Sequence, residues 1–152
     1  MNELRDIVQL LEIAFSPNTY ESSLVHALHR ANREIVEKTV CRDDKLIAYS
    51  AFSKAYRRGA HIGWHLAPVA VDPGHQRQGA GTRIIGDGLK DPRIRGAPVF
   101  VLGQPRYYER FGFEVTPSIY CPFDPSGQNF QSLNWASRER FQIAYEKEFN
   151  EA

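Results

Sequence analysis

The segment that most restricts the fold of this chain is an apolar run followed by a glycine-rich turn. Residues 62–71 are predicted to form a strand, residues 76–82 contain Gly-Ala-Gly, and the next residues have the apolar spacing of a helix. Glycine has no Cβ, so a ligand can approach the main chain closely. The first N–H groups of a helix have no partner within it and favour an anion. The segment therefore predicts a phosphate-binding strand–turn–helix unit.

Two other phosphate-binding motifs do not fit this segment. A dinucleotide-binding GxGxxG sequence needs a third glycine where this chain has Ile84. The P-loop sequence, GxxxxGK followed by Ser or Thr, does not occur in the chain. A lone GxG is also compatible with an ordinary helix start, so the rest of the chain is needed to decide.

The rest of the chain alternates between helical and extended patterns. Helices are predicted at 4–15, 20–31, 84–89, 105–111 and 137–151, and strands at 35–41, 46–53, 62–71, 98–102 and 129–134, with another starting at Phe113. The first two strands form a hairpin, and a basic loop is predicted at 56–59. Helices, an antiparallel meander and a βαβ-like unit together indicate a mixed α/β (α+β) fold.

Length and composition favour one domain without a membrane span. The chain has 152 residues, of which 42% are hydrophobic, and one domain typically has about 50–250 residues. We therefore expect a single domain over residues 1–152. No apolar run approaches the roughly 18 residues that a membrane helix needs. The first residues alternate in charge and lack the apolar core of a signal peptide, so we expect a cytoplasmic protein.

Charge and cysteine usage argue against two further kinds of partner. The formal net charge is +1, although residues 57–110 carry nine Lys and Arg against four Asp and Glu. No groove-reading motif accompanies these charges, so we expect no nucleic acid to bind. Cys41 and Cys121 are interpreted as reduced thiols. With the five histidines they make no metal-ligand spacing, so we expect no metal.

Two motifs together resemble the signatures of the GNAT superfamily of N-acetyltransferases. Residues 69–81 read Val-Ala-Val-Asp-Pro-Gly-His-Gln-Arg-Gln-Gly-Ala-Gly. This string resembles the family's acetyl-CoA signature. In that signature a strand and an acidic-Pro turn precede a loop of Gln or Arg, any two residues, Gly, any residue, and Gly or Ala. Further on, Tyr107–Phe113 resembles the second signature, a tyrosine on a short helix before Gly-Phe. Residues 102–105 and the double tyrosine are similar to the YhbS-like branch.

The resemblance implies an acetyl-CoA site at the glycine-rich turn. In this family a central, mostly antiparallel sheet carries helices on both faces, and acetyl-CoA lies where two strands splay apart. Here those strands are 69–71 and 99–102, and Pro68, which lacks an N–H, fits an interrupted ladder. The implied acetyl-CoA contacts are main-chain groups of Val69, Ala70 and Val71 for the acetyl and pantetheine part, and of Arg77, Gln78, Gly79, Ala80, Gly81 and Thr82 for the pyrophosphate.

The resemblance also implies an acyl-CoA-dependent N-acyltransferase reaction. An amine would attack the thioester of acetyl-CoA directly in a ternary complex. Tyr108, at the family's general-acid position, would protonate the departing CoA thiolate, whereas Tyr107 is interpreted as a packing residue. The general base stays open between His65, Glu37 and water. The alternatives are an acyltransferase for a longer acyl-CoA and a domain that binds acyl-CoA without catalysis.

The acceptor and the end of the chain stay undecided at this point. The acceptor is an amine of a small molecule or of a protein, and the loops that would surround it show no specificity pattern. Phe141, Tyr145 and Phe149 have helical spacing, which predicts a C-terminal helical extension over residues 137–152. That helix could pack on the domain, cover the acceptor site or form a homodimer.

Overall fold

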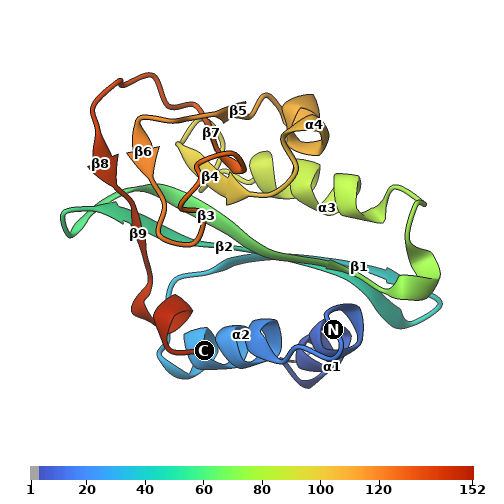
Figure 1. The fold of residues 1–152 in the computed structure, drawn as a ribbon. Helices are drawn as coiled ribbons and strands as arrows, with labels where there is room; N and C mark the ends of the chain where they lie inside the picture. The colour runs from blue at the N-terminus through green and yellow to red at the C-terminus, as the bar shows by residue number, and fades with distance from the viewer. Residues whose placement is uncertain (1–3) are drawn as a thin grey trace.

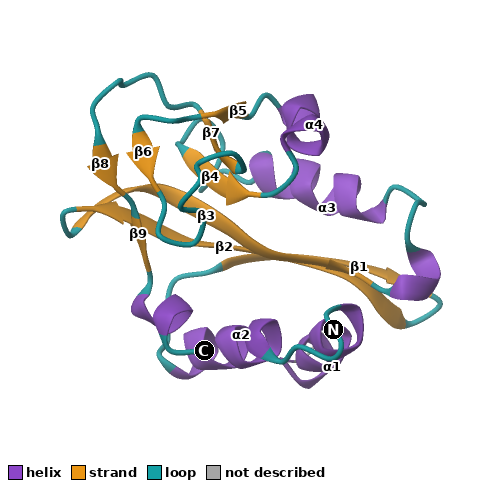
Figure 2. Cartoon of the chain, in the orientation of Figure 1, coloured by secondary structure: helices purple, strands orange, loops and turns teal. Residues whose placement is uncertain are grey.

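A computed structural model describes residues 4–152 as a sheet with helices on both faces (Figure 1). Helices α1 (Leu4–Ala14) and α2 (Tyr20–Arg30) lie on one face, and α3 (Ala80–Leu89) and α4 (Pro105–Tyr108) lie on the other. Figure 2 separates these two helical layers from the strands between them. Short 3-10 turns complete the helical elements: η1 (Pro73–His75), η2 (Glu109–Phe111) and η3 (Lys147–Asn150).

The main sheet is mostly antiparallel. Its strand order is β1-β2-β3-β4-β7-β5, and β9 pairs with the end of β2. Strands β3 and β4 run parallel, and every other described pair in this sheet is antiparallel. A second sheet joins β6 and β8. These results confirm the predicted mixed α/β class. The strands are β1 (Val36–Arg42), β2 (Lys45–Arg57), β3 (Ala60–Val71), β4 (Val99–Leu102), β5 (Glu114–Val115), β6 (Ile119–Tyr120), β7 (Phe130–Leu133), β8 (Phe141–Gln142) and β9 (Ala144–Tyr145).

Strand β2 is buried on both of its faces. Tyr49 belongs to the core cluster formed with α1 and α2, whereas Phe52 belongs to the cluster formed with α3. A strand covered from both sides is expected to be a nearly continuous apolar run, and residues 46–52 of β2 are apolar except for Ser50. Gly88 lets α3 approach the sheet closely, because a Cβ there would lie 2.3 Å from Cε1 of Phe52.

Strands β3 and β4 separate after a short paired stretch. Within residues 4–152 they pair at two positions, Trp64 with Val99 and His65 with Phe100. Immediately beyond, β3 bulges: Ser50 of β2 pairs with Val69 and Phe52 pairs with Leu66, so that residues 67–68 oppose a single residue. The predicted splaying of the two strands is therefore present, and Pro68 lies in the bulge where it begins.

The prediction of a C-terminal helix over residues 137–152 is wrong. The segment contains β8, β9 and η3 instead. Phe141, Ile143 and Tyr145 are buried, and the residues between them are exposed, which is the alternation of a strand. Pairing with β6 and with the end of β2 satisfies the main chain, so this extended form replaces the helix that the spacing of the aromatic residues suggested.

The predicted basic loop at 56–59 is shorter than expected. Strand β2 continues to Arg57 and β3 starts at Ala60, so the turn consists of Arg58 and Gly59, both with positive φ. Strand β2 continues this far because Ala55 and Tyr56 pair with β9, which comes from the distant C-terminal part of the chain.

Candidate active site

The glycine-rich turn lies between the end of β3 and the start of α3. Gly79 is the N-cap of α3 and adopts φ +84°, a left-handed conformation that favours glycine. Residues 76–79 are exposed, so their main-chain groups are accessible to a ligand. Of the predicted acetyl-CoA contacts, Val69–Val71 form the last residues of β3, and Arg77–Thr82 form the turn and the first residues of α3.

Asp72 fixes the start of this turn. Its Oδ1 accepts a hydrogen bond from the Gly74 N–H at 2.8 Å and lies 3.3 Å from Nδ1 of His75. Its Oδ2 lies 3.1 Å from Nζ of Lys45. The Gly74 bond and the partners His75 and Lys45 lower the pKa of Asp72. The carboxylate is thus fully engaged in holding the loop and is not free for chemistry.

Tyr107 connects α4 to the start of α3. Its hydroxyl lies 3.0 Å from Oγ1 of Thr82, and the Arg110 guanidinium lies 4.4 Å from the centre of its ring. The hydroxyl contact joins the short helix to the first turn of α3, and the Arg110 contact covers the ring from within the same segment. This geometry agrees with a packing role for Tyr107.

Tyr108 faces a pocket on the other side of α4. Burial, together with the neighbouring Tyr107, raises the pKa of Tyr108 to about 12, so the phenol is protonated at neutral pH and can donate a hydrogen bond. Gly103 makes room for the ring, since a Cβ there would lie 2.3 Å from Cε2 of Tyr108. The sequence analysis used Gly103 as part of the motif at residues 102–105 and did not foresee its contact with Tyr108.

The pocket in front of Tyr108 has a volume of about 260 Å³. It brings together the β3 bulge, helix α2 and the C-terminal segment. Of the predicted site residues, Tyr108, Val69 and His65 line it. Its other walls come from Phe15, Tyr20, Glu21, Leu24, Leu66, Ala67, Pro68, Leu102, Phe123, Tyr145 and Phe149. Glu21 was not singled out from the sequence. Tyr145 and Phe149 were expected in a helix that could cover the acceptor site, and they reach this pocket from β9 and η3 instead.

His65 is buried in the wall of this pocket. Its ring stacks on Tyr145 with 3.5 Å between ring centres and lies 4.7 Å from the ring of Phe149. Among residues 4–152 its Nδ1 has no hydrogen-bond partner. Burial lowers the pKa of His65 to about 3, so the imidazole is neutral near pH 7 and is a poor base.

Glu37 lies outside the pocket. Its Oε2 accepts a hydrogen bond from the Tyr49 hydroxyl at 2.5 Å and lies 2.8 Å from Nε2 of His29. The carboxylate therefore ties β1 and β2 to helix α2. Glu37, although one of the predicted candidates, is not brought together with Tyr108.

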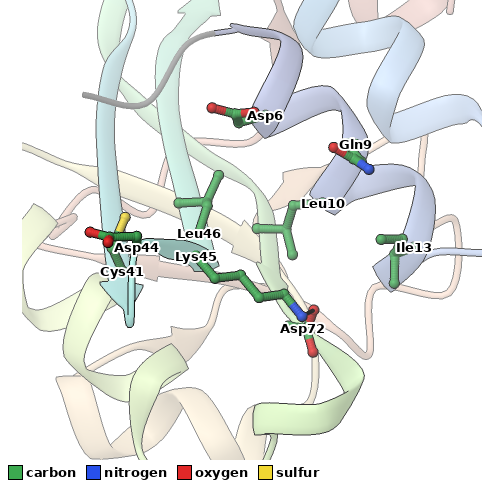
Figure 3. A pocket seen from close by; sticks show the side chains of 9 residues that line it. All are labelled: Asp6, Gln9, Leu10, Ile13, Cys41, Asp44, Lys45, Leu46 and Asp72. Carbon is green, nitrogen blue, oxygen red and sulfur yellow. Dashed lines mark ion pairs between the residues drawn. The ribbon is translucent and has the colours of Figure 1, made fainter.

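A second hollow, of about 520 Å³, lies between α1 and the hairpin of β1 and β2 (Figure 3). Asp72 and Lys45 form their ion pair at its edge. Tyr108 and the β3 bulge do not line this hollow, and its Asp72 carboxylate already has partners. The pocket at Tyr108 is therefore the better candidate for chemistry.

The part of the chain that the structure describes offers neither a metal-binding cluster nor a membrane-spanning helix. Over the described residues, no group of three His, Cys, Asp or Glu side chains could hold a metal ion. No helix within 4–152 combines the length and the apolar character needed to cross a bilayer.

Comparison with known proteins gives a consistent result. The model of the acetyltransferase (GNAT) family matches residues 3–113. The chain is 37% identical over 117 residues to the uncharacterized N-acetyltransferase YhbS of Escherichia coli (strain K12), which spans 73% of this chain and 70% of that protein. The match to YhbS is consistent with the YhbS-like motif at residues 102–105 and the double tyrosine.

Two solved structures have the same fold over nearly the whole chain. The crystal structure of YhbS from Escherichia coli in complex with CoA has a TM-score of 0.86 and 27% identity, and covers 97% of this chain and 86% of its own. A GNAT family acetyltransferase from Brucella melitensis in complex with acetyl-CoA has a TM-score of 0.80 and 30% identity, covering 96% and 91%. The chain therefore belongs to the acetyltransferase (GNAT) family.

Proposed function

We propose that this protein transfers the acetyl group of acetyl-CoA to a primary amine by direct attack in a ternary complex. The observation that carries the proposal is the position of Tyr108. Its protonated phenol shares one pocket with the β3 bulge, where β3 and β4 have separated. The two CoA- or acetyl-CoA-bound relatives of similar fold support acetyl-CoA as the donor.

In this proposal acetyl-CoA lies across the end of β3 and the start of α3. Main-chain groups of Val69–Val71 on the side facing β4 pair with the pantetheine arm and the acetyl group. The N–H groups of Arg77–Thr82 bind the pyrophosphate, aided by the positive end of the α3 dipole. The left-handed Gly79 allows the close approach that this contact needs.

The chemistry requires three groups. The amine nitrogen attacks the thioester carbon, a main-chain N–H stabilises the negative charge that develops on the carbonyl oxygen, and Tyr108 gives a proton to the sulfur. The products are an amide and CoA thiol. A phenol with a pKa of about 12 carries its proton at neutral pH, so Tyr108 enters the reaction in the form that can donate.

Replacement of Tyr108 by Phe tests this role. We expect kcat for CoA release in the presence of an amine to fall by roughly 10²–10⁴-fold, because the general acid is lost. Acetyl-CoA affinity, measured by calorimetry, should stay unchanged. Tyr120, exposed at 48%, provides the matched control as Tyr120→Phe, which should keep full activity. Equal activity of the two variants would refute the role of Tyr108.

A further inference from the structure

We infer that the pocket at Tyr108 takes a small primary amine with an apolar body, whose ammonium group pairs with the Glu21 carboxylate. The inference rests on the proposed acetyl transfer and names the class of its acceptor. Three features of the pocket carry it: an unsatisfied carboxylate oxygen, an aromatic wall and a small volume.

Glu21 supplies the charge. It lies in the first turn of α2 and lines the pocket. Its Oε1 is buried and has no hydrogen-bond partner among residues 4–152. A buried carboxylate oxygen without a donor is costly, so the site favours a ligand that brings one. Among the described lining residues Glu21 is the only carboxylic acid, and the one imidazole, that of His65, is neutral near pH 7.

Aromatic side chains supply the rest of the acceptor site. Phe123 stacks on Tyr145 with 5.9 Å between ring centres, and Phe149 lies 5.6 Å from Tyr145. Phe123 is 44% exposed although it is a large apolar residue, which leaves surface for a ligand to cover. An apolar body fits this wall, whereas a polyamine or aminoglycoside would bury further ammonium groups without partners.

The size of the pocket favours a compact acceptor. Its volume is about 260 Å³, and pockets for drug-sized ligands span roughly 300–1,000 Å³. The acetyl end of the donor occupies the side of the β3 bulge and Tyr108. The acceptor then binds in the other part of the pocket, which is formed by α2, Phe123 and the C-terminal segment. A single aromatic ring or a short alkyl chain suits this remaining space.

Glu21 also gives the acceptor a route to its reactive form. An alkylammonium has a pKa of about 10.4 and must lose a proton before it attacks. One N–H bond breaks as Glu21 becomes a carboxylic acid, and the neutral amine forms the C–N bond. Tyr108 protonates the sulfur as the C–S bond breaks, and a second amine proton restores Tyr108. Glu21 finally releases its proton to water, which leaves an amide and CoA thiol.

The first experiment measures CoA release with 2-phenylethylamine, hexylamine, spermidine and a lysine-containing peptide as acceptors. We expect the two monoamines to be preferred. In the Glu21→Gln variant kcat/KM for 2-phenylethylamine should fall by roughly 10–100-fold, because a charge-assisted hydrogen bond is lost. Acetyl-CoA affinity should not change. Glu12, exposed on α1, provides the control variant Glu12→Gln, which should keep the activity of the unmodified protein.

A second variant tests the contribution of the aromatic wall independently of the Glu21 carboxylate. We expect Phe123→Ala to raise KM for 2-phenylethylamine about tenfold while kcat changes little, since an apolar contact is lost. Tyr120→Ala removes an equally exposed aromatic residue outside the pocket and should leave KM unchanged. Phe123 is partly exposed, so its removal should leave the fold intact.

The outcomes distinguish the inference from the proposed function. Transfer confined to spermidine or to the peptide would overturn the inference and keep the acetyltransferase. Faster turnover with longer acyl-CoA donors, abolished by Phe123→Ala, would assign the pocket to the acyl chain and also overturn the inference. Tight acetyl-CoA binding without transfer to any amine would overturn both.

Discussion

At the scale of single residues, the orientation of Tyr108 depends on Gly103. The Gly103 N–H donates to the Asn129 carbonyl at 3.1 Å, and its carbonyl accepts from Nε2 of Gln131 at 3.1 Å. The main chain at this position is therefore fixed from both sides. Since the Tyr108 ring occupies the space of a Cβ, a side chain at residue 103 can be accommodated only if the tyrosine moves.

We predict that Gly103→Ala lowers kcat by about as much as Tyr108→Phe, because the added Cβ would lie 2.3 Å from the ring and displace the phenol. Acetyl-CoA affinity, measured by calorimetry, should be preserved. Gly86→Ala is the control, because a Cβ at this helical position meets no atom of the described residues within 4 Å. That variant should be more stable by up to about 1 kcal/mol and fully active.

His65 is a second residue whose surroundings determine a property of the protein, in this case the pH dependence of its stability. Burial lowers its pKa from 6.5 to about 3. The unfolded chain therefore binds a proton at this residue at a higher pH than the folded chain does. Above pH 6.5 the neutral, buried His65 makes its full contribution to the free energy of unfolding. That contribution is lost progressively as the pH falls from 6.5 toward 3.

We predict that this proton uptake destabilises the protein by about 2 kcal/mol at pH 5 relative to pH 7, at about 1.36 kcal/mol per pH unit below 6.5. His65→Phe keeps an aromatic ring against Tyr145 and should remove this part of the pH dependence in urea unfolding. His26→Gln, at an exposed position on α2, should leave the slope unchanged. An unaltered slope in His65→Phe would contradict the assignment.

At the scale of elements, buried carboxylates hold the C-terminal segment to strand β2 and to the connection between α2 and β1. Arg33 pairs with Glu148 through two hydrogen bonds of 2.9 and 3.1 Å, and this contact lowers the pKa of Glu148. Glu146 accepts a hydrogen bond from the Tyr56 hydroxyl at 2.9 Å. These contacts position β9 and η3, and with them two aromatic walls of the pocket.

We predict that Arg33→Met destabilises the protein by about 3 kcal/mol, because Glu148 is left buried without its partner. Amide hydrogen exchange should accelerate first in residues 141–150. Arg57→Met breaks a more exposed pair with Glu139 and should cost at most about 1 kcal/mol. Comparable losses in the two variants, measured by urea unfolding, would argue against a special role for the Arg33 contact.

At the scale of the whole molecule, one core cluster draws on the beginning, the middle and the end of the chain. Leu28 of α2, Phe100 of β4 and Phe130 of β7 pack in it with Phe141 and Phe149. The last segment is therefore part of the core, although the family model matches only residues 3–113. Its removal would expose a large apolar surface on the sheet.

We predict that a chain truncated after residue 136 loses cooperative thermal unfolding, because aromatic residues of this cluster would face water. Circular dichroism and binding of a hydrophobic dye would detect the loss. A truncated chain that still unfolds cooperatively and binds acetyl-CoA would instead show that the segment is an independent addition.

Signals that were local in the sequence predicted the glycine-rich turn and singled out the motif around Tyr108. The turn at 72–82 carries its own conformational requirements, in the left-handed Gly79 and in the N–H groups at the start of a helix. The motif around Tyr108 is also local. These properties depend on neighbouring residues, so they can be recognised without knowledge of the fold.

Contacts between distant segments decided the rest. Phe141, Tyr145 and Phe149 fit a helix, whereas Phe141, Ile143 and Tyr145 equally fit a strand, and pairing with β2 and β6 selected the strand. The same packing brought Glu21 of α2 next to the β3 bulge. The sequence by itself determined the glycine-rich turn and the general-acid candidate. The tertiary structure alone decided the pocket at Tyr108, because its walls come from segments more than 100 residues apart.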